Sequence, residues 1–115
     1  VSRSHQEKIL SFAETARQEK AKFHLGDTQP ALEAPLKGGY FVHPIVVSEV
    51  DPGSRICQDE IFGPFVSVTP FKDEGEAVRL ANNTRYGLSA SVWTNDVSRV
   101  HRLGEELQVG TIWFN

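Results

Sequence analysis

Short apolar stretches alternate with helical patterns along the second half of the chain. Residues 65–71, 88–94 and 111–114 are rich in the β-branched and aromatic side chains that favour strands. Between them lie two amphipathic segments, each opened by a side chain that commonly caps helices. A helix between two strands can serve as the crossover that parallel strands require. The sequence therefore predicts an α/β fold, with a mostly parallel sheet and helices on both faces.

The first half is predicted to add a long helix and two more strands. Ser4 begins an S-x-x-E capping box, and apolar residues then recur at helical spacing until about Ala21. Strands are expected at 22–25 and 40–50. Pro44 has no N–H to donate, so it either breaks the second of these strands in two or restricts it to a sheet edge.

The composition fits one globular domain at most. The chain has 115 residues, of which 39% are hydrophobic and 23% charged, unlike a disordered chain. A net charge of −3 gives no reason to expect nucleic acid or an acidic membrane surface as a partner. No apolar run approaches the ~18 residues of a membrane span. One cysteine cannot form an internal disulfide and no signal-peptide pattern occurs, so we expect a cytoplasmic protein.

Both ends of the sequence are abrupt. The chain contains no Met, starts at Val1 and stops within the apolar residues 110–115. A finished domain more often tapers into polar residues. We therefore expect a piece of a longer protein.

Two residue types could carry chemistry but give weak signals. Cys57 is the only thiol, and a catalytic thiol needs a neighbouring base or cation. A small thiol enzyme built on Cys57 is one hypothesis, and inert packing is the one that its apolar neighbours favour. The histidines, His5, His24, His43 and His101, lack metal-ligand spacing, so no metal site is predicted.

Residues 58–64 (Q-D-E-I-F-G-P) form the most informative segment. They place two acidic residues before an aromatic residue and a Gly-Pro break. Residues 55–60, which overlap this segment, fit either a short strand or a helical turn. Such a segment can hold a carboxylate and a ring at the rim of a sheet, where ligands of α/β proteins bind. The alternative is a polar turn in which Phe62 anchors into the core.

Residues 60–64 (E-I-F-G-P) match a signature of the NAD(P)-dependent aldehyde dehydrogenase superfamily. Further blocks resemble that family in the same order. They are residues 39–46 (G-Y-F-V-H-P-I-V, with Ile45 in place of the usual Thr), 81–90 (A-N-N-T-R-Y-G-L-S-A), 92–96 (V-W-T-N-D) and 110–115 (G-T-I-W-F-N). No single block is decisive, but the ordered set covers essentially the whole chain and is highly specific.

The resemblance implies roles for two side chains, with NAD or NADP as the cofactor. The Glu60 carboxylate would accept hydrogen bonds from the ribose hydroxyls on the nicotinamide side, since an ionised carboxylate can take two donors. Phe62 would pack near the nicotinamide ring and limit where it lies. The family's nucleophilic Cys and general-base Glu lie upstream of these blocks, and Cys57 is in the wrong place to be that nucleophile. No catalytic residue is therefore expected here.

The resemblance also implies an architecture and partners. Residues 1–115 would be part of a three-layer catalytic domain, without the nucleotide-binding domain or the oligomerisation segment, and inactive alone. The partners would be a small aldehyde, the remainder of the catalytic domain and further copies of the chain, because exposed sheet edges invite association. Residues 51–57 resemble semialdehyde dehydrogenases in particular. The alternative is a stand-alone truncated homologue that acts as a non-catalytic binding or assembly module.

Overall fold

A computed structural model describes residues 2–29 and 31–115 of the chain. The chain divides into two compact units, an N-terminal unit that ends at Thr69 and a C-terminal unit, Pro70–Asn115. Each unit combines helices with a pair of parallel strands. The predicted α/β class is therefore confirmed.

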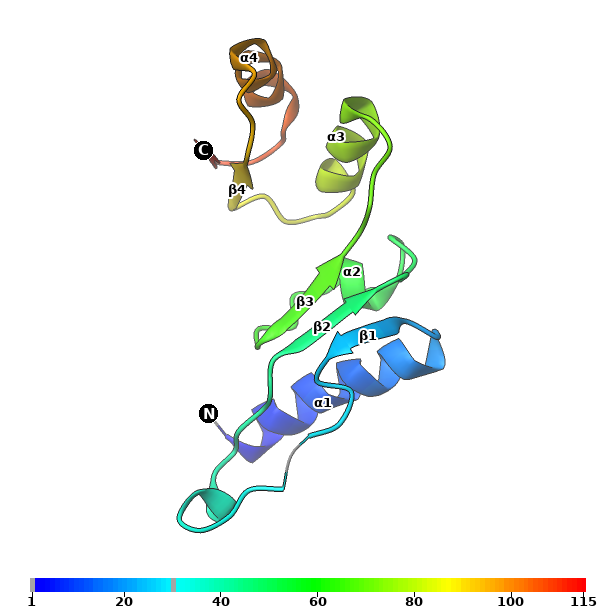
Figure 1. The fold of residues 1–115 in the computed structure, drawn as a ribbon, viewed down its shortest axis with the longest axis vertical. Helices are drawn as coiled ribbons and strands as arrows, with labels where there is room; N and C mark the ends of the chain where they lie inside the picture. Colours follow the sequence, from blue (N-terminus) through cyan, green and yellow to red (C-terminus); the bar gives the residue numbers. More distant parts are fainter. Residues whose placement is uncertain (1, 30) are drawn as a thin grey trace. The chain divides into compact units, whose positions relative to one another are not determined.

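The N-terminal unit contains a three-stranded sheet in the order β1-β2-β3 (Figure 1). β1 pairs antiparallel with β2, and β2 pairs parallel with β3, with Ile45 opposite Phe65. The elements of this unit are α1 (Arg3–Gln18), β1 (Lys22–Leu25), the 3₁₀ helix η1 (Leu36–Gly38), β2 (Ile45–Ser48), α2 (Arg55–Gln58) and β3 (Phe65–Val68).

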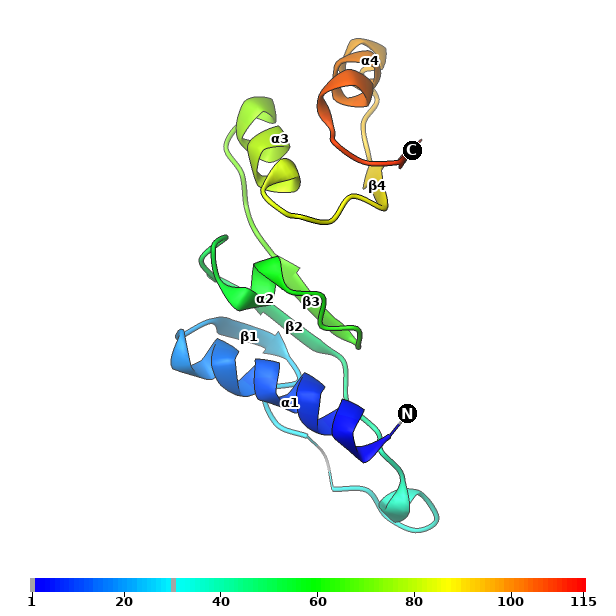
Figure 2. The ribbon, with the colours of Figure 1, turned by 180° about the vertical axis from the view of Figure 1, so that it is seen from behind.

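One face of this sheet forms the core with α1 and α2. Alternate residues of β2, Ile45 and Val47, are fully buried, as expected for a strand with one covered face. The helices lie over that face (Figure 2). They contribute the apolar stripe of α1 and one residue of α2 to the core, which consists of Ile9, Phe12, Ala13, Ala16, Ile45, Val47, Val50, Ile56 and Ile61.

The C-terminal unit has the order α3 (Glu74–Asn82), β4 (Ser89–Val92), α4 (Val97–Glu106) and β5 (Thr111–Phe114). β4 and β5 pair in parallel, with Ser89 opposite Thr111. α4 connects the two paired strands, so it is the crossover helix that the alternating pattern predicts.

Three local predictions need correction. α1 is capped by Ser2, whose Oγ accepts from the His5 N–H at 3.2 Å, and not by Ser4. It ends at Gln18, before Lys20 takes a φ of 61°, and not near Ala21. The strand expected at 40–50 starts only after Pro44, because a proline cannot donate to the ladder.

Residues 55–60 fit either a short strand or a helical turn in the sequence, and the structure has a helical turn at Arg55–Gln58, capped by Ser54. Within the residues that the structure describes, no helix is both long enough and apolar enough to cross a membrane.

Candidate functional site

The E-I-F-G-P segment forms an irregular turn between α2 and β3. Its second residue, Ile61, is 8% exposed and belongs to the core. Its neighbours are exposed: Glu60 lies at the surface, and the Phe62 ring is 72% exposed. The alternative in which Phe62 anchors this turn into the core is therefore wrong, since Ile61 is the anchor. A carboxylate and an aromatic ring are presented outward, one on each side of that anchor.

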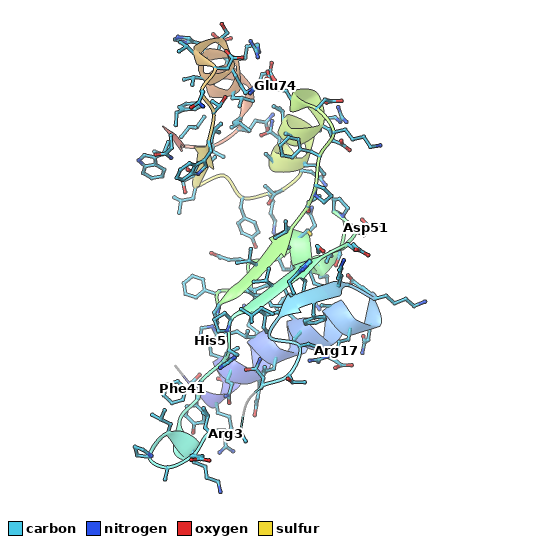
Figure 3. The ribbon with its side chains drawn as sticks, viewed as in Figure 1. Arg3, His5, Arg17, Phe41, Asp51 and Glu74 are labelled. Carbon is cyan, nitrogen blue, oxygen red and sulfur yellow. The ribbon has the colours of Figure 1, made fainter. Side chains whose placement is uncertain are left out.

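Phe62 has an unusual backbone conformation, with a φ of 59°. A bulky side chain in this left-handed region costs about 1–3 kcal/mol and persists only where the surroundings hold it. Here the holding group is His5, in the first turn of α1 (Figure 3). Its Nε2 donates to the Phe62 carbonyl oxygen at 2.7 Å, and the two rings have centroids 6.2 Å apart.

The Gly-Pro pair fixes the end of the turn. A Cβ on Gly63 would lie 2.5 Å from Cδ1 of the buried Ile9, so only glycine allows the chain to approach α1 this closely. The Phe65 N–H donates to the Gly63 carbonyl at 2.8 Å, which closes a γ-turn around Pro64. The Ile45 N–H donates to the Pro64 carbonyl at 2.8 Å and ties the turn to β2.

α1 therefore supports the turn. Besides His5 and Ile9, it supplies Lys8, whose Nζ donates to the Glu60 carbonyl oxygen over a longer distance of 3.4 Å. All of these contacts involve the backbone of the turn or Gly63. Among the described residues, no group donates to the Glu60 carboxylate, so its oxygens are available to an external donor.

The residues of α1 that contact the turn could not be identified from sequence. His5 and Phe62 are 57 residues apart, and Lys8 and Glu60 are 52 apart. No local pattern links positions so far apart. The only signal is that Ile9 lies on the predicted apolar stripe of α1, which indicates that this helix packs against something.

The other candidates do not assemble a site. Cys57 is half-buried and packs against the core, as the inert hypothesis expects. His24 Nε2 lies 2.7 Å from the Ser48 hydroxyl, across the β1–β2 pair. In the described ranges, no three His, Cys, Asp or Glu side chains come together as a metal would require.

The strongest electrostatic feature lies in the C-terminal unit, at the start of α3 (Figure 3). The Glu74 carboxylate accepts from Arg102 Nε at 2.7 Å and from Arg99 Nε at 2.8 Å. Hydrogen bonds from Arg102 and then Arg99 lower the pKa of the Glu74 carboxyl from 4.5 to about 2. This cluster connects α3 to α4 and serves the fold of its own unit.

Comparison with known proteins identifies the family and the fold of the chain. The sequence pattern of the aldehyde dehydrogenase family matches residues 1–115. The chain is 44% identical, over its whole length, to the 2-aminomuconic semialdehyde dehydrogenase of Danio rerio, and covers 24% of that protein. It is 49% identical over 95% of its length to acetaldehyde dehydrogenase 2 of Cupriavidus necator, and covers 21% of that protein. The chain belongs to the aldehyde dehydrogenase family.

Solved structures agree. Betaine aldehyde dehydrogenase of Staphylococcus aureus, in complex with NAD⁺, matches 98% of the chain with a TM-score of 0.90 and 38% identity, and the match covers 23% of that protein. Indole-3-acetaldehyde dehydrogenase of P. syringae, in complex with NAD⁺, matches with a TM-score of 0.89 and 34% identity; the match covers 98% of this chain and 22% of that protein. The chain therefore spans about a quarter of the length of these relatives.

Proposed function

We propose that the chain is part of an enzyme that oxidises an aldehyde to a carboxylic acid with NAD(P)⁺, and that this segment positions the cofactor. The observation that carries the proposal is the turn at residues 60–64. It presents an available carboxylate and an exposed aromatic ring on a backbone held by α1 and β2. The family and the NAD⁺ complexes of similar structures support the same assignment.

Glu60 would bind the ribose on the nicotinamide side. A ribose offers two neighbouring hydroxyl donors, and an ionised carboxylate accepts two donors at once. The Glu60 carboxylate suits this task, because it is exposed and makes no competing hydrogen bond within the described residues. The backbone of Glu60 is held by the buried Ile61 beside it.

Phe62 would limit where the nicotinamide ring can lie. Its ring is 72% exposed, and the backbone that carries it is fixed by the bond to His5. When bound, the cofactor supplies the hydride acceptor, and hydride transfer requires its reactive carbon to be held close to the substrate carbon. An aromatic side chain on a fixed backbone can position the nicotinamide ring in this way.

Several finer statements belong to the same proposal. The NAD⁺ complexes of the similar structures favour NAD⁺ as the cofactor. The names of several relatives favour a semialdehyde as the substrate. We further propose that residues 1–115 are a part of the catalytic domain and inactive alone, with the nucleophilic Cys, the general-base Glu and the nucleotide-binding domain outside this segment. The protein would act in the cytoplasm as a homo-oligomer.

The test is Glu60→Gln in the protein that carries this chain. Glutamine keeps the size of the side chain but removes the charge, so the KM for NAD⁺ should rise by about 10-fold or more, as for the loss of charge-assisted hydrogen bonds. Glu105→Gln, an exposed carboxylate on α4, is the matched control and should leave the KM unchanged. Wild-type cofactor affinity and rate in Glu60→Gln would show the proposed role to be wrong.

A further inference from the structure

We propose that His5 is a positioning residue for the cofactor. Through its hydrogen bond to the Phe62 carbonyl, it holds the backbone conformation that presents Phe62 and, two residues earlier, Glu60. The inference rests on the proposed function, since it assigns a task to the residue that orients the two proposed cofactor contacts. It depends on a contact within the N-terminal unit only.

The backbone of Phe62 is strained and requires a group that holds it. Phe62 has a φ of 59°, a conformation that a bulky side chain rarely adopts. An outlier of this kind is maintained by its surroundings and is common at ligand-binding sites. The Phe62 side chain does not maintain it by burial, because the ring is 72% exposed. The conformation must therefore be held through the backbone.

His5 is the group that holds this backbone. The neighbouring residues of the turn have other anchors: Ile61 is buried, Gly63 accepts from the Phe65 N–H, and Pro64 accepts from the Ile45 N–H. Within the described part of the chain, the Phe62 carbonyl has His5 as its partner, at 2.7 Å. The bond from Lys8 to the Glu60 carbonyl is longer, at 3.4 Å, and therefore weaker.

His5 is itself mounted on a rigid element. Its own N–H donates to the cap Ser2, and Ile9 and Phe12, one and two turns further along α1, are almost fully buried. Its ring also lies against the Phe62 ring, with centroids 6.2 Å apart and planes tilted by 35°. The imidazole therefore contacts both the carbonyl and the ring of the residue that it positions.

The direction of the hydrogen bond determines which substitution can replace His5. A carbonyl oxygen only accepts, so Nε2 of His5 carries the proton. A glutamine side chain offers an N–H donor of comparable reach, whereas leucine fills similar space without a donor. His5→Gln and His5→Leu therefore separate the hydrogen bond from the packing. His101, exposed on α4, provides the matched control His101→Leu.

A spectroscopic test reads the turn directly. Phe62-Gly63 is the only Phe-Gly pair in the chain, so ¹³C-carbonyl-Phe and ¹⁵N-Gly labelling gives one signal, from that peptide bond. We expect His5→Leu to shift this signal, His5→Gln to return it toward the wild-type position, and His101→Leu to leave it unchanged. An unmoved signal in a folded His5→Leu chain would overturn the inference, whatever the cofactor does.

A kinetic test reads the consequence in the protein that carries this chain. His5→Leu should raise the KM for NAD⁺ by about 2- to 10-fold, the range of one neutral hydrogen bond, and leave the KM for the aldehyde unchanged. His5→Gln should restore most of the loss, which a purely structural role would not require. If Glu60→Gln weakens cofactor binding and His5→Leu does not, the positioning role fails while the proposed function stands. If Glu60→Gln has no effect, the proposed function fails, and the carbonyl signal alone tests the role of His5 at the turn.

Discussion

The two units of the chain share the same types of secondary-structure element but are stabilised by different contacts. Each contains a pair of parallel strands and two α-helices. Of the hydrophobic side chains that are buried in the described residues, all but Leu103 lie in the N-terminal unit. The C-terminal unit instead leaves Leu88 and Trp93 exposed, at 87% and 80%. The proposed cofactor contacts belong to the unit that has a core.

Polar contacts hold the C-terminal unit. Besides the Glu74 cluster, Asn82 at the end of α3 donates to the Glu106 carbonyl at 2.8 Å and accepts from the Gln108 N–H at 2.9 Å. Asn82 thereby ties α3 to the segment that follows α4. This is a structural reason for an asparagine in the A-N block of residues 81–90. The two β-α-β patterns therefore differ in their contacts, since one surrounds a buried core and the other is accompanied mainly by exposed polar contacts.

The largest expected effect comes from removing core volume. Phe12 is 4% exposed, so Phe12→Ala should lower the free energy of unfolding of the N-terminal unit by about 3–5 kcal/mol. Amide hydrogen exchange of β2 measures this, with β4 and β5 as internal reference. Val97→Ala, at a side chain that is 70% exposed, is the control in the other unit and should change exchange little. An equal loss of protection in both units would contradict the distinction between them.

A smaller effect is expected at the turn itself. Gly63→Ala places a Cβ 2.5 Å from Cδ1 of Ile9, which is buried and cannot move away freely. We expect a loss of about 1–3 kcal/mol, as for overpacking, in chemical denaturation of the N-terminal unit. Gly38→Ala is the control, because an added Cβ there meets nothing within 4 Å. Equal stability of the two variants would mean that the close approach to α1 is not needed.

The smallest effect is expected at Glu74, because its ion pairs are exposed and screened by salt. The pKa of its carboxyl is lowered from 4.5 to about 2, by Arg102 first and Arg99 second. A lowered folded-state pKa stabilises the unit above pH 4.5, and this contribution disappears as the pH falls toward 2. A carboxyl ¹³C titration measures the midpoint, and Arg102→Gln should raise it. A midpoint near 4.5 in the unmodified chain would show that the cluster does not form.

Sequence predicted the parts of the fold that local signals determine. Asp73 caps α3 and the strand at 111–114 forms where the pattern places it, because side-chain caps and β-branched runs act locally. For α4 the pattern offers Asn95 or Asp96 as the cap, and the structure has Asp96. The predicted cap of the first helix, Ser4, is wrong, because the helix begins at Arg3 and Ser2 caps it.

The candidate site was predictable only in part. The E-I-F-G-P signature marked Glu60 and Phe62, and the structure exposes both. The sequence did not indicate that Ile61 is the anchor and that His5 holds the turn. Both facts depend on how α1 packs against the sheet, which no short window of sequence contains.

The contact between His5 and Phe62 also has a kinetic consequence. It closes a segment of 57 residues, and the left-handed conformation of Phe62 has no local residue that would favour it. Contacts between distant positions form slowly, because the chain must lose loop entropy before they are made. We expect the turn to reach its final shape only after α1 has docked on the sheet. The surface proposed to bind the cofactor would then be among the last parts of the N-terminal unit to mature during folding.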